Sequence, residues 1–282
     1  MAGESVKEYE QSVALNGQEP LPRLRLAAYY ARLGLLDKAV AQLKTVVRLD
    51  PKGPQAHYLL AMVYSSQNKF DLAAGEYELI LKSASADNPE NTEIYLYLAQ
   101  LYSSERKFDE AIVQFNKILE VQPDNVSAYY LLGSIYLETG DRAKAKDAFK
   151  KVLALEPDHD GALNSLGYIY AEDGVNLDEA LKMARRAVDL DPSNGAYYDT
   201  LGWVLYKKGM NAQALMALQK AEAYIQDPVL YDHLGDVYKA VKEFTLARKC
   251  WHRSLDMKPG QAQVSRKLEE LEKVHAFNGN SP

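Results

Sequence analysis

The 282-residue chain has a single cysteine, Cys250, so it contains no internal disulfide. It lacks the run of about 20 apolar residues that a helix needs to cross a bilayer. No apolar segment follows charged residues near its start, as it would in a signal peptide. We therefore expect no direct membrane insertion. We leave the compartment unknown: cytoplasmic if the chain is complete, periplasmic or envelope if it is a piece of a longer protein.

Long basic stretches are also missing. The 33 basic and 39 acidic residues are interleaved, and the net charge is −6. Nucleic acids are bound mainly through clustered Lys and Arg side chains that meet phosphate groups. We therefore expect no nucleic-acid partner.

Recognisable reaction chemistry is absent from the sequence as well. The five histidines are scattered and none has a metal-ligand spacing. No Gly-rich phosphate loop or nucleophile motif occurs. We predict no catalytic residues, no metal and no cofactor, and we hold an enzyme as the least favoured function class.

A repeat dominates what the sequence does contain. The phrase Leu-Gly/Ala-x-x-Tyr, or a close variant, returns seven times, at intervals of 34, 38, 34, 34, 35 and 33 residues. A period in this range predicts stacked copies of one supersecondary unit. The small residues at its second position are Ala27, Ala61, Ala99, Gly133, Gly167, Gly202 and Gly235.

Each unit is predicted to be two short amphipathic helices. In the fourth unit, Gly140 separates a helix around Gly133 from a second helix over 143–155, which Pro157 follows. We expect acidic residues to cap the start of four second helices. These residues are Asp37, Asp71, Asp109 and Asp178. A small residue allows two helices to approach closely, so a bulky replacement at Gly133 or Gly167 should overpack the joint by about 1–3 kcal/mol.

At these residues the chain resembles the tetratricopeptide repeat (TPR) family, which has the order Leu-Gly/Ala, Tyr, then Ala, a large residue, Ala and Pro. The resemblance implies an all-α fold, an α-solenoid wound as a right-handed superhelix of about seven helix-turn-helix repeats with a C-terminal capping helix. Blocks such as 163–180 and 199–206 also resemble C-terminal parts of bacterial TPR scaffold and adaptor proteins, some of which deliver substrates to envelope proteases.

The repeat predicts the organisation of the chain. Residues 1–19 form an N-terminal helix or partial repeat, 20–260 the repeats, 261–277 a capping helix and 278–282 a disordered tail. The predicted repeats are 20–53, 54–91, 92–125, 126–159, 160–194, 195–227 and 228–260. Extra residues over 82–89 and 172–176 should perturb the stack locally.

In the TPR family, partner contacts come mainly from first-helix positions three before and one after the small residue, on a concave wall. That resemblance implies Leu24 and Ala28 in the first repeat and a principal set in the others. The predicted partner-binding residues are Tyr58, Met62, Leu96, Gln100, Tyr130, Ser134, Asn164, Tyr168, Asp199, Trp203, Tyr206, Asp232 and Asp236.

This set is apolar and aromatic early in the chain and gains three aspartates later. Aromatic side chains offer a large contact area at low entropic cost, and the acids favour basic groups. We therefore predict a non-catalytic interaction scaffold whose groove holds a protein or peptide segment with apolar anchors and some basic character. The Lys, Asn and Arg set with which some TPR proteins clamp a chaperone C-terminus is missing here. The alternatives are a self-assembling, homo-oligomeric module and an adaptor for a bacterial envelope protease.

Overall fold

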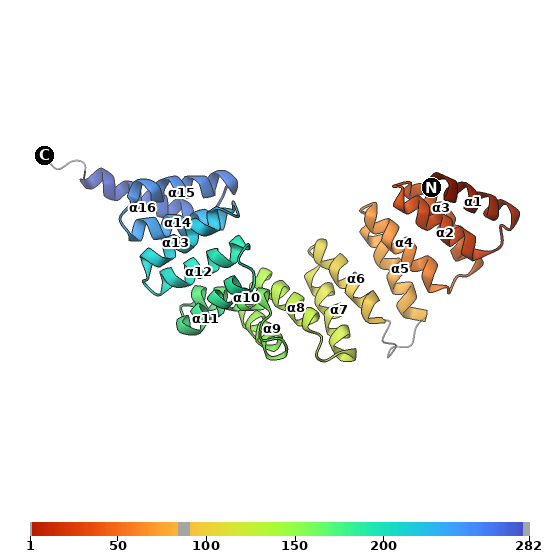
Figure 1. Ribbon diagram of the computed structural model, residues 1–282, viewed down its shortest axis with the longest axis horizontal. Coiled ribbons are helices and arrows are strands. Elements are labelled where there is room, and N and C mark those ends of the chain that lie inside the picture. The colour runs from red at the N-terminus through yellow and green to blue at the C-terminus, as the bar shows by residue number, and fades with distance from the viewer. Residues whose placement is uncertain (1, 84–90, 279–282) are drawn as a thin grey trace. The chain divides into compact units, whose positions relative to one another are not determined.

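The computed structural model describes residues 2–83 and 91–278, and every regular element in them is an α-helix (Figure 1). The chain divides into two compact units, Met1–Ile135 and Tyr136–Pro282. Helix α8 crosses this division. The helices are α1 (Ala2–Leu15), α2 (Pro20–Arg32), α3 (Leu36–Leu49), α4 (Pro54–Ser66), α5 (Phe70–Ser83), α6 (Asn91–Ser104), α7 (Phe108–Val121), α8 (Val126–Glu138), α9 (Arg142–Leu155), α10 (Asp160–Asp173), α11 (Leu177–Leu190), α12 (Gly195–Lys207), α13 (Asn211–Glu222), α14 (Pro228–Ala240), α15 (Phe244–Met257) and α16 (Ala262–Asn278).

Consecutive helices pack as hairpins within each unit. In the first unit α2 packs on α3, α4 on α5 and α6 on α7. In the second unit the pairs are α10 with α11, α12 with α13 and α14 with α15. Second helices also contact the first helix of the next pair, α3 with α4 and α5 with α6 in the first unit, and α9 with α10, α11 with α12 and α13 with α14 in the second. These contacts bury the apolar sides of neighbouring pairs against each other. The predicted all-α solenoid of about seven repeats is confirmed.

The two ends of the chain extend this pattern. Helix α1 packs on α2, and the Tyr30 hydroxyl donates to Glu10 at 2.6 Å. Helix α16 packs on α15, as other first helices pack on the second helix before them. Asn278 is the last residue of α16, and the rest of the predicted tail lies outside the described residues. The exact repeat boundaries stay a prediction.

The turn inside each hairpin needs one residue with a left-handed backbone. Three repeats place a residue other than glycine there, Asn68, Arg106 and Lys242, with φ of 57°, 56° and 66°. Glycine serves in the other four, and Gly209 has a φ of 76°. A left-handed conformation brings a side chain's Cβ close to the following carbonyl, so glycine is the residue that adopts it without strain.

The sequence predicted local irregularities at two places with extra residues, 82–89 and 172–176. The extra residue of the fifth repeat adds a second left-handed position, because both Gly174 (φ 68°) and Asn176 (φ 50°) adopt that conformation. The extension near Lys82 falls largely on residues 84–90, which lie outside the described residues.

The closing prolines end the second helices as predicted. Helices α3, α7, α9, α11 and α15 each stop two residues before a proline. The residue between, for example Glu156 (φ −129°, ψ 89°), leaves the helical region because the proline ring clashes with a helical predecessor.

The predicted capping role is wrong for Asp37, Asp109 and Asp178. The residues that precede α3, α7 and α11 are Leu35, Lys107 and Asn176, and none makes a side-chain cap. The aspartates lie inside the first turn, where they still suit the helix dipole. Three of them accept hydrogen bonds from the hairpin turn of the next repeat: Asp37 from Gln67 at 2.9 Å, Asp71 from Lys107 at 2.9 Å and Asp178 from Lys208 at 2.5 Å.

The glycine joints are not equally tight. A Cβ added at Gly167 would lie 3.4 Å from the Ala180 carbonyl oxygen and 3.7 Å from Met183 Cβ, which is ordinary contact. At Gly202 it would lie 2.5 Å from Leu218 Cγ, and at Gly235 it would overlap the indole of the fully buried Trp251. The steric need for glycine is therefore strongest in the last two repeats.

We predict opposite effects of alanine at two of these joints. Gly235→Ala should lower the free energy of unfolding by about 1–3 kcal/mol because the buried indole must move. Gly167→Ala should raise it by about 0.5–1 kcal/mol, since the methyl group fits and alanine favours a helix over glycine. Urea unfolding followed by circular dichroism measures both. Equal effects of the two changes would contradict the steric assignment.

We also predict that Lys242→Gly stabilises the protein by about 0.5–1 kcal/mol, because glycine removes the left-handed strain at an exposed position. The reciprocal control is Gly209→Ala, where a Cβ meets no atom within 4 Å and only the φ of 76° is strained. That change should destabilise by about 1 kcal/mol. Thermal unfolding of both variants gives the comparison, and a neutral result for the pair would show that the turn tolerates any residue.

Candidate functional site

The first helices of neighbouring repeats touch in a fixed register. Counting from the small residue of the motif as position 0, position −3 of one repeat meets position −2 of the next. The Tyr58 hydroxyl donates to Tyr97 Oη at 2.9 Å, and Asp199 Oδ1 lies 2.8 Å from His233 Nδ1. Two predicted partner-binding residues, Tyr58 and Asp199, therefore also link adjacent repeats.

Three tyrosines form a cluster in the first unit. Tyr58 makes edge contacts with Tyr77 and Tyr97, at centroid distances of 6.2 and 5.6 Å, and Tyr77 stacks on Tyr97 at 5.6 Å. Tyr97 donates to Glu93 at 2.9 Å. Burial raises the pKa of Tyr77 to about 12, with the neighbouring Tyr58 and Glu93 adding to the effect. The Tyr77 phenol therefore stays protonated at neutral pH, and the cluster offers apolar ring surface.

A pocket of about 860 Å³ opens beside this cluster. Tyr58, Leu59, Ile80 and Ile94 give it an apolar wall, and Glu93 and Lys52 add charge at its edge. Of the predicted partner-binding residues, only Tyr58 lines it. The pocket gives the first unit a concave surface to which α4, α5 and α6 all contribute.

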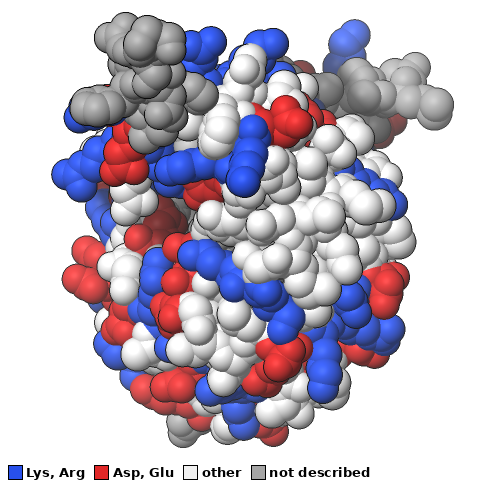
Figure 2. All heavy atoms as spheres, turned by 90° about the vertical axis from the view of Figure 1, so that its left-hand side faces the viewer, with Lys and Arg blue, Asp and Glu red and all other residues white. Residues whose placement is uncertain are grey.

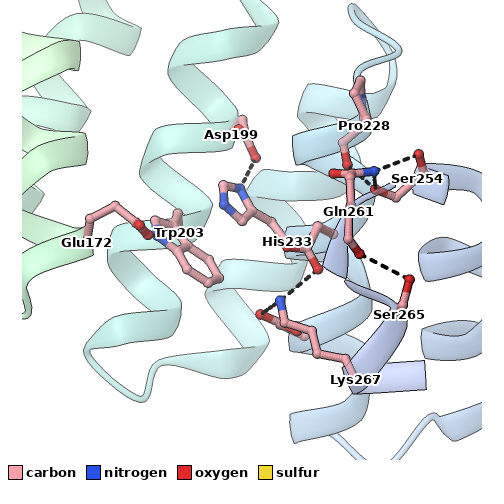
Figure 3. A network of polar contacts seen from close by, with 11 residues as sticks. Glu172, Asp199, Trp203, Pro228, His233, Ser254, Gln261, Ser265 and Lys267 are labelled. Carbon is pink, nitrogen blue, oxygen red and sulfur yellow. Dashed lines mark hydrogen bonds and ion pairs between the residues drawn. The ribbon is translucent and has the colours of Figure 1, made fainter. Parts of the chain in front are cut away.

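The second unit holds a stacked group centred on Trp203 (Figure 3). The indole stacks on His233 at a centroid distance of 4.0 Å and on Tyr206 at 5.2 Å. Its Nε1–H donates to Glu172 Oε1 at 2.7 Å. Trp203 is only 6% exposed, so this side chain mainly joins α10, α12 and α14.

The two last aspartates of the predicted site are paired within the chain. Lys267 Nζ of α16 lies 2.7 Å from Asp232 Oδ1 and 2.7 Å from Asp236 Oδ2. Burial raises the pKa of Asp236, although Lys267 acts against this shift. Burial also disfavours the charge on Lys267, but the two carboxylates outweigh it and its pKa is raised.

The remaining predicted residues differ in accessibility. Met62 is 45% exposed and Gln100 is exposed. The others are half-buried: Leu96, Tyr130, Ser134, Asn164, Tyr168 and Tyr206. Burial, followed by the charges of Glu172 and Asp199, strongly raises the pKa of Tyr168. The Oδ1 of Asn164 is buried without a hydrogen-bond partner within the protein.

Sequence reasoning missed three residues that complete this site: His233, Glu172 and Lys267. The repeat itself could have revealed two of them. His233 is 34 residues after Asp199, and Lys267 is 35 residues after Asp232. Glu172 carried no such signal, since it reaches Trp203 from the end of α10.

The face shown in Figure 2 carries basic and acidic side chains side by side around an uncharged area. Several of the charges on the second unit are paired, such as Arg142 with Asp173 at 3.1 Å and Arg186 with Asp158 at 2.8 Å. On this face neither sign gathers into one extended patch.

Comparison with known proteins identifies the family to which the repeat belongs. A family model for the middle TPR-like domain of cilia and flagella-associated protein 70 matches residues 95–243, and a tetratricopeptide repeat model matches residues 24–89. The chain belongs to the tetratricopeptide repeat family. A search of curated protein sequences returned no match.

Solved TPR structures share the fold at low sequence identity. A tetratricopeptide repeat protein from Parabacteroides merdae is 20% identical with a TM-score of 0.64, over 95% of this chain and 99% of that one. PilW, a type IV pilus biogenesis factor, is 20% identical with a TM-score of 0.60, over 76% and 98% of the two chains. YrrB, a TPR protein with an unusual peptide-binding site, is 20% identical with a TM-score of 0.54, over 67% and 95%.

Within residues 2–83 and 91–278, no group of three or more His, Cys, Asp and Glu side chains is arranged to hold a metal ion. No helix in the described part is both long and apolar enough to span a membrane. Cys250 is partly buried, and burial raises its thiol pKa to about 11, so the thiolate that reacts is scarce at neutral pH.

Next to Tyr58, His57 is held by oxygen atoms at both ring nitrogens. Nδ1 lies 2.6 Å from Glu76 Oε2 and Nε2 lies 3.0 Å from the Pro51 carbonyl oxygen. Only the doubly protonated ring can donate to both. Burial lowers the pKa of His57, but the hydrogen bonds to Glu76 and Pro51 together outweigh it, so the pKa is raised.

We predict that this histidine makes stability depend on pH. Since its pKa is higher in the folded state, its contribution is complete below the unfolded value of about 6.5 and is lost as pH rises through the folded value. Urea unfolding of the parent should show falling stability from mildly acidic to alkaline pH. Glu76→Gln should flatten that slope, and an unchanged slope would contradict the assignment.

Proposed function

We propose that this TPR protein is a non-catalytic scaffold that binds a protein or peptide segment along the first helices of its repeats. The proposal is carried by one observation: these helices present, in register, the aromatic and polar side chains described above. The family consists generally of interaction scaffolds, and its relative YrrB is described as having a peptide-binding site.

The exposure of the predicted residues reduces the number that a partner could contact. In the first unit the exposed Met62 and Gln100 occupy the same position of consecutive repeats, and Met62 is one helical turn after the pocket-lining Tyr58. In the second unit Tyr168 and Tyr206 are half-buried, whereas Trp203 is buried and stacks on Tyr206. We expect Met62, Gln100, Tyr168 and Tyr206 to make contact, and Trp203 to shape the surface.

The partner should combine apolar anchors with basic groups. Aromatic and methionine side chains provide adaptable apolar contact area. In the second unit, Asp199, Asp232, Asp236 and Glu172 lie on neighbouring first helices. The basic groups paired with them are Lys267, with Asp232 and Asp236, and Arg142, with Glu172. A segment with Lys or Arg among apolar residues fits this surface better than an acidic one.

A matched pair of variants tests the proposal in the second repeat. Met62→Asp changes the first helix of the repeat, α4, and Leu79→Asp changes its second helix, α5. The two are matched in exposure, since the Met62 side chain is 45% exposed and the Leu79 side chain 46%. A partner is first identified by affinity capture and mass spectrometry, and its affinity is then measured with purified proteins. Met62→Asp should weaken binding about tenfold or more, equivalent to at least 1.4 kcal/mol.

Leu79→Asp should leave that affinity within about a factor of two, because Leu79 is not on a first helix and does not line the pocket. Both variants must retain the parent's helical circular dichroism. Weakening by Leu79→Asp alone would place the partner on the second helices and refute the proposal.

A separate measurement tests the alternative that the protein is a self-assembling module. Light scattering over a wide concentration range separates a monomer from an oligomer, and a constant monomer mass removes that alternative. An adaptor role for an envelope protease would be recognised by a protease among the captured partners.

A further inference from the structure

His57 and Arg23 occupy equivalent positions in consecutive repeats, four residues before the small residue of the motif. Arg23 donates to two oxygen atoms. Its Nε meets the Gly17 carbonyl, six residues earlier, at 3.0 Å, and its Nη1 meets Gln42 Oε1, 19 residues later, at 2.7 Å. Gly17 lies in the connection between α1 and α2, and Gln42 lies in α3. The guanidinium thus forms a bridge, a two-point contact that ties this connection to the second helix of the repeat.

His57 makes the same two contacts one repeat later. Its Nε2 meets the Pro51 carbonyl, six residues earlier, in the connection between α3 and α4, and its Nδ1 meets Glu76 of α5, 19 residues later. The side chains of His57 and Glu76 are only 6% and 19% exposed. The later repeats have Tyr95, Tyr129, Leu163, Tyr198 and Tyr231 at this position. The fold of a repeat therefore does not require a histidine here.

The two bridges differ in their response to pH. Arginine stays charged and always has enough N–H donors for both oxygens. A neutral imidazole has one N–H, so it can serve only one of two acceptors. The carboxylate of Glu76 is the stronger acceptor, because a hydrogen bond to a charged group is shorter and stronger than one to a carbonyl. A neutral His57 therefore keeps Glu76 and turns a lone pair towards the Pro51 carbonyl.

The groups around the imidazole favour its protonated form. Burial lowers the pKa of His57, but the hydrogen bonds to Glu76 and Pro51 and the charges of Glu76 and Asp50 outweigh it, so the pKa is raised. Glu76 faces the ring from α5, and Asp50 lies in the connection that follows α3. The bridge is therefore complete below the ordinary histidine pKa of about 6.5 and is lost as pH rises through the raised value.

The connection held by this bridge forms part of the pocket in the first unit. Its residue Lys52 and the first two residues of α4, Pro54 and Gln55, line the pocket beside Tyr58. The hydrogen bond within the turn, from Gly53 N to the Asp50 carbonyl, is 3.3 Å long and therefore weak. The contact with His57 is what ties the turn to α5, so its loss frees one wall of the pocket.

We propose that His57 is a pH-dependent bridge. When protonated it holds the connection between α3 and α4 against α5 and fixes one wall of the pocket, and when neutral it keeps Glu76 and releases the connection. The bridge itself does not depend on the proposed scaffold function. Its consequence does: a partner that uses the pocket would bind more tightly at mildly acidic pH than at alkaline pH.

Spin labelling of the two equivalent connections tests the proposal. In a Cys250→Ser background, a nitroxide is attached at the exposed Lys52→Cys before α4, or at the exposed Gln18→Cys before α2. Electron paramagnetic resonance measures label mobility at about pH 5.5 and about pH 8.5, on either side of the ordinary histidine pKa. The label at Lys52→Cys should move about twofold or more faster at the higher pH. The label at Gln18→Cys, whose connection Arg23 holds, should change by less than about 20%.

Two variants identify the group that responds. His57→Arg supplies both donors at either pH, as Arg23 does, so the label at Lys52→Cys should become insensitive to pH. Glu76→Gln should have the same effect for a different reason. Its amide N–H can donate to Nδ1, which leaves the single N–H of a neutral ring for Pro51. If Glu76 only stabilised the helix pair, its loss would instead loosen the connection at both pH values, and that result would overturn the proposal.

The proposal is also overturned if the parent shows no pH response, or if the response persists in His57→Arg. This variant must retain the parent's helical circular dichroism, and if it does not, Glu76→Gln alone decides. A missing pH response leaves the scaffold function intact. Failure of Met62→Asp to weaken a captured partner leaves the bridge intact, so the two proposals fail separately.

Discussion

Each helix pair in this protein can bury its apolar side only against the pairs next to it, and the rest of the structure follows from this constraint. Because stabilising contacts are made between neighbours, the same positions recur in each repeat and the same contacts return with them. The register between position −3 of one repeat and −2 of the next is the clearest example. It links Tyr58 with Tyr97, Asp199 with His233 and Asp232 with Lys267.

This register changes how the surface of the first helices must be understood. A residue at −3 is shared between holding two repeats together and meeting a partner. Asp199 is committed to His233, and the buried Trp203 is committed to stacking and to Glu172. Position +1 varies from repeat to repeat: Met62 and Gln100 are exposed, whereas Trp203 is buried. The same position therefore serves stability in one repeat and can serve recognition in another, and substitutions that test binding have to be chosen at exposed residues.

The sequence was sufficient for the helix pairs, the closing prolines and the presence of a helix after the last repeat, because each depends on local rules. It was insufficient where a contact crosses from one repeat to another. The aspartates of the second helices were expected to be caps, but Asp71 and Asp178 pair with lysines in the turn of the next repeat. The unequal tightness of Gly167 and Gly235 depends on whether the facing residue is Met183 or the indole of Trp251. Lys267 was overlooked because α16 was regarded only as a cap and not as a first helix in register.

The central claim is that first-helix residues of adjacent repeats are energetically coupled through the −3 to −2 contact. A double-mutant cycle on Asp199 and His233 measures this coupling directly, using Asp199→Asn, His233→Gln and the double variant in urea unfolding followed by tryptophan fluorescence. The 2.8 Å contact between two buried or half-buried side chains predicts a coupling energy of about 1 kcal/mol or more. Additive effects of the two substitutions would contradict the account and return Asp199 to the surface available to a partner.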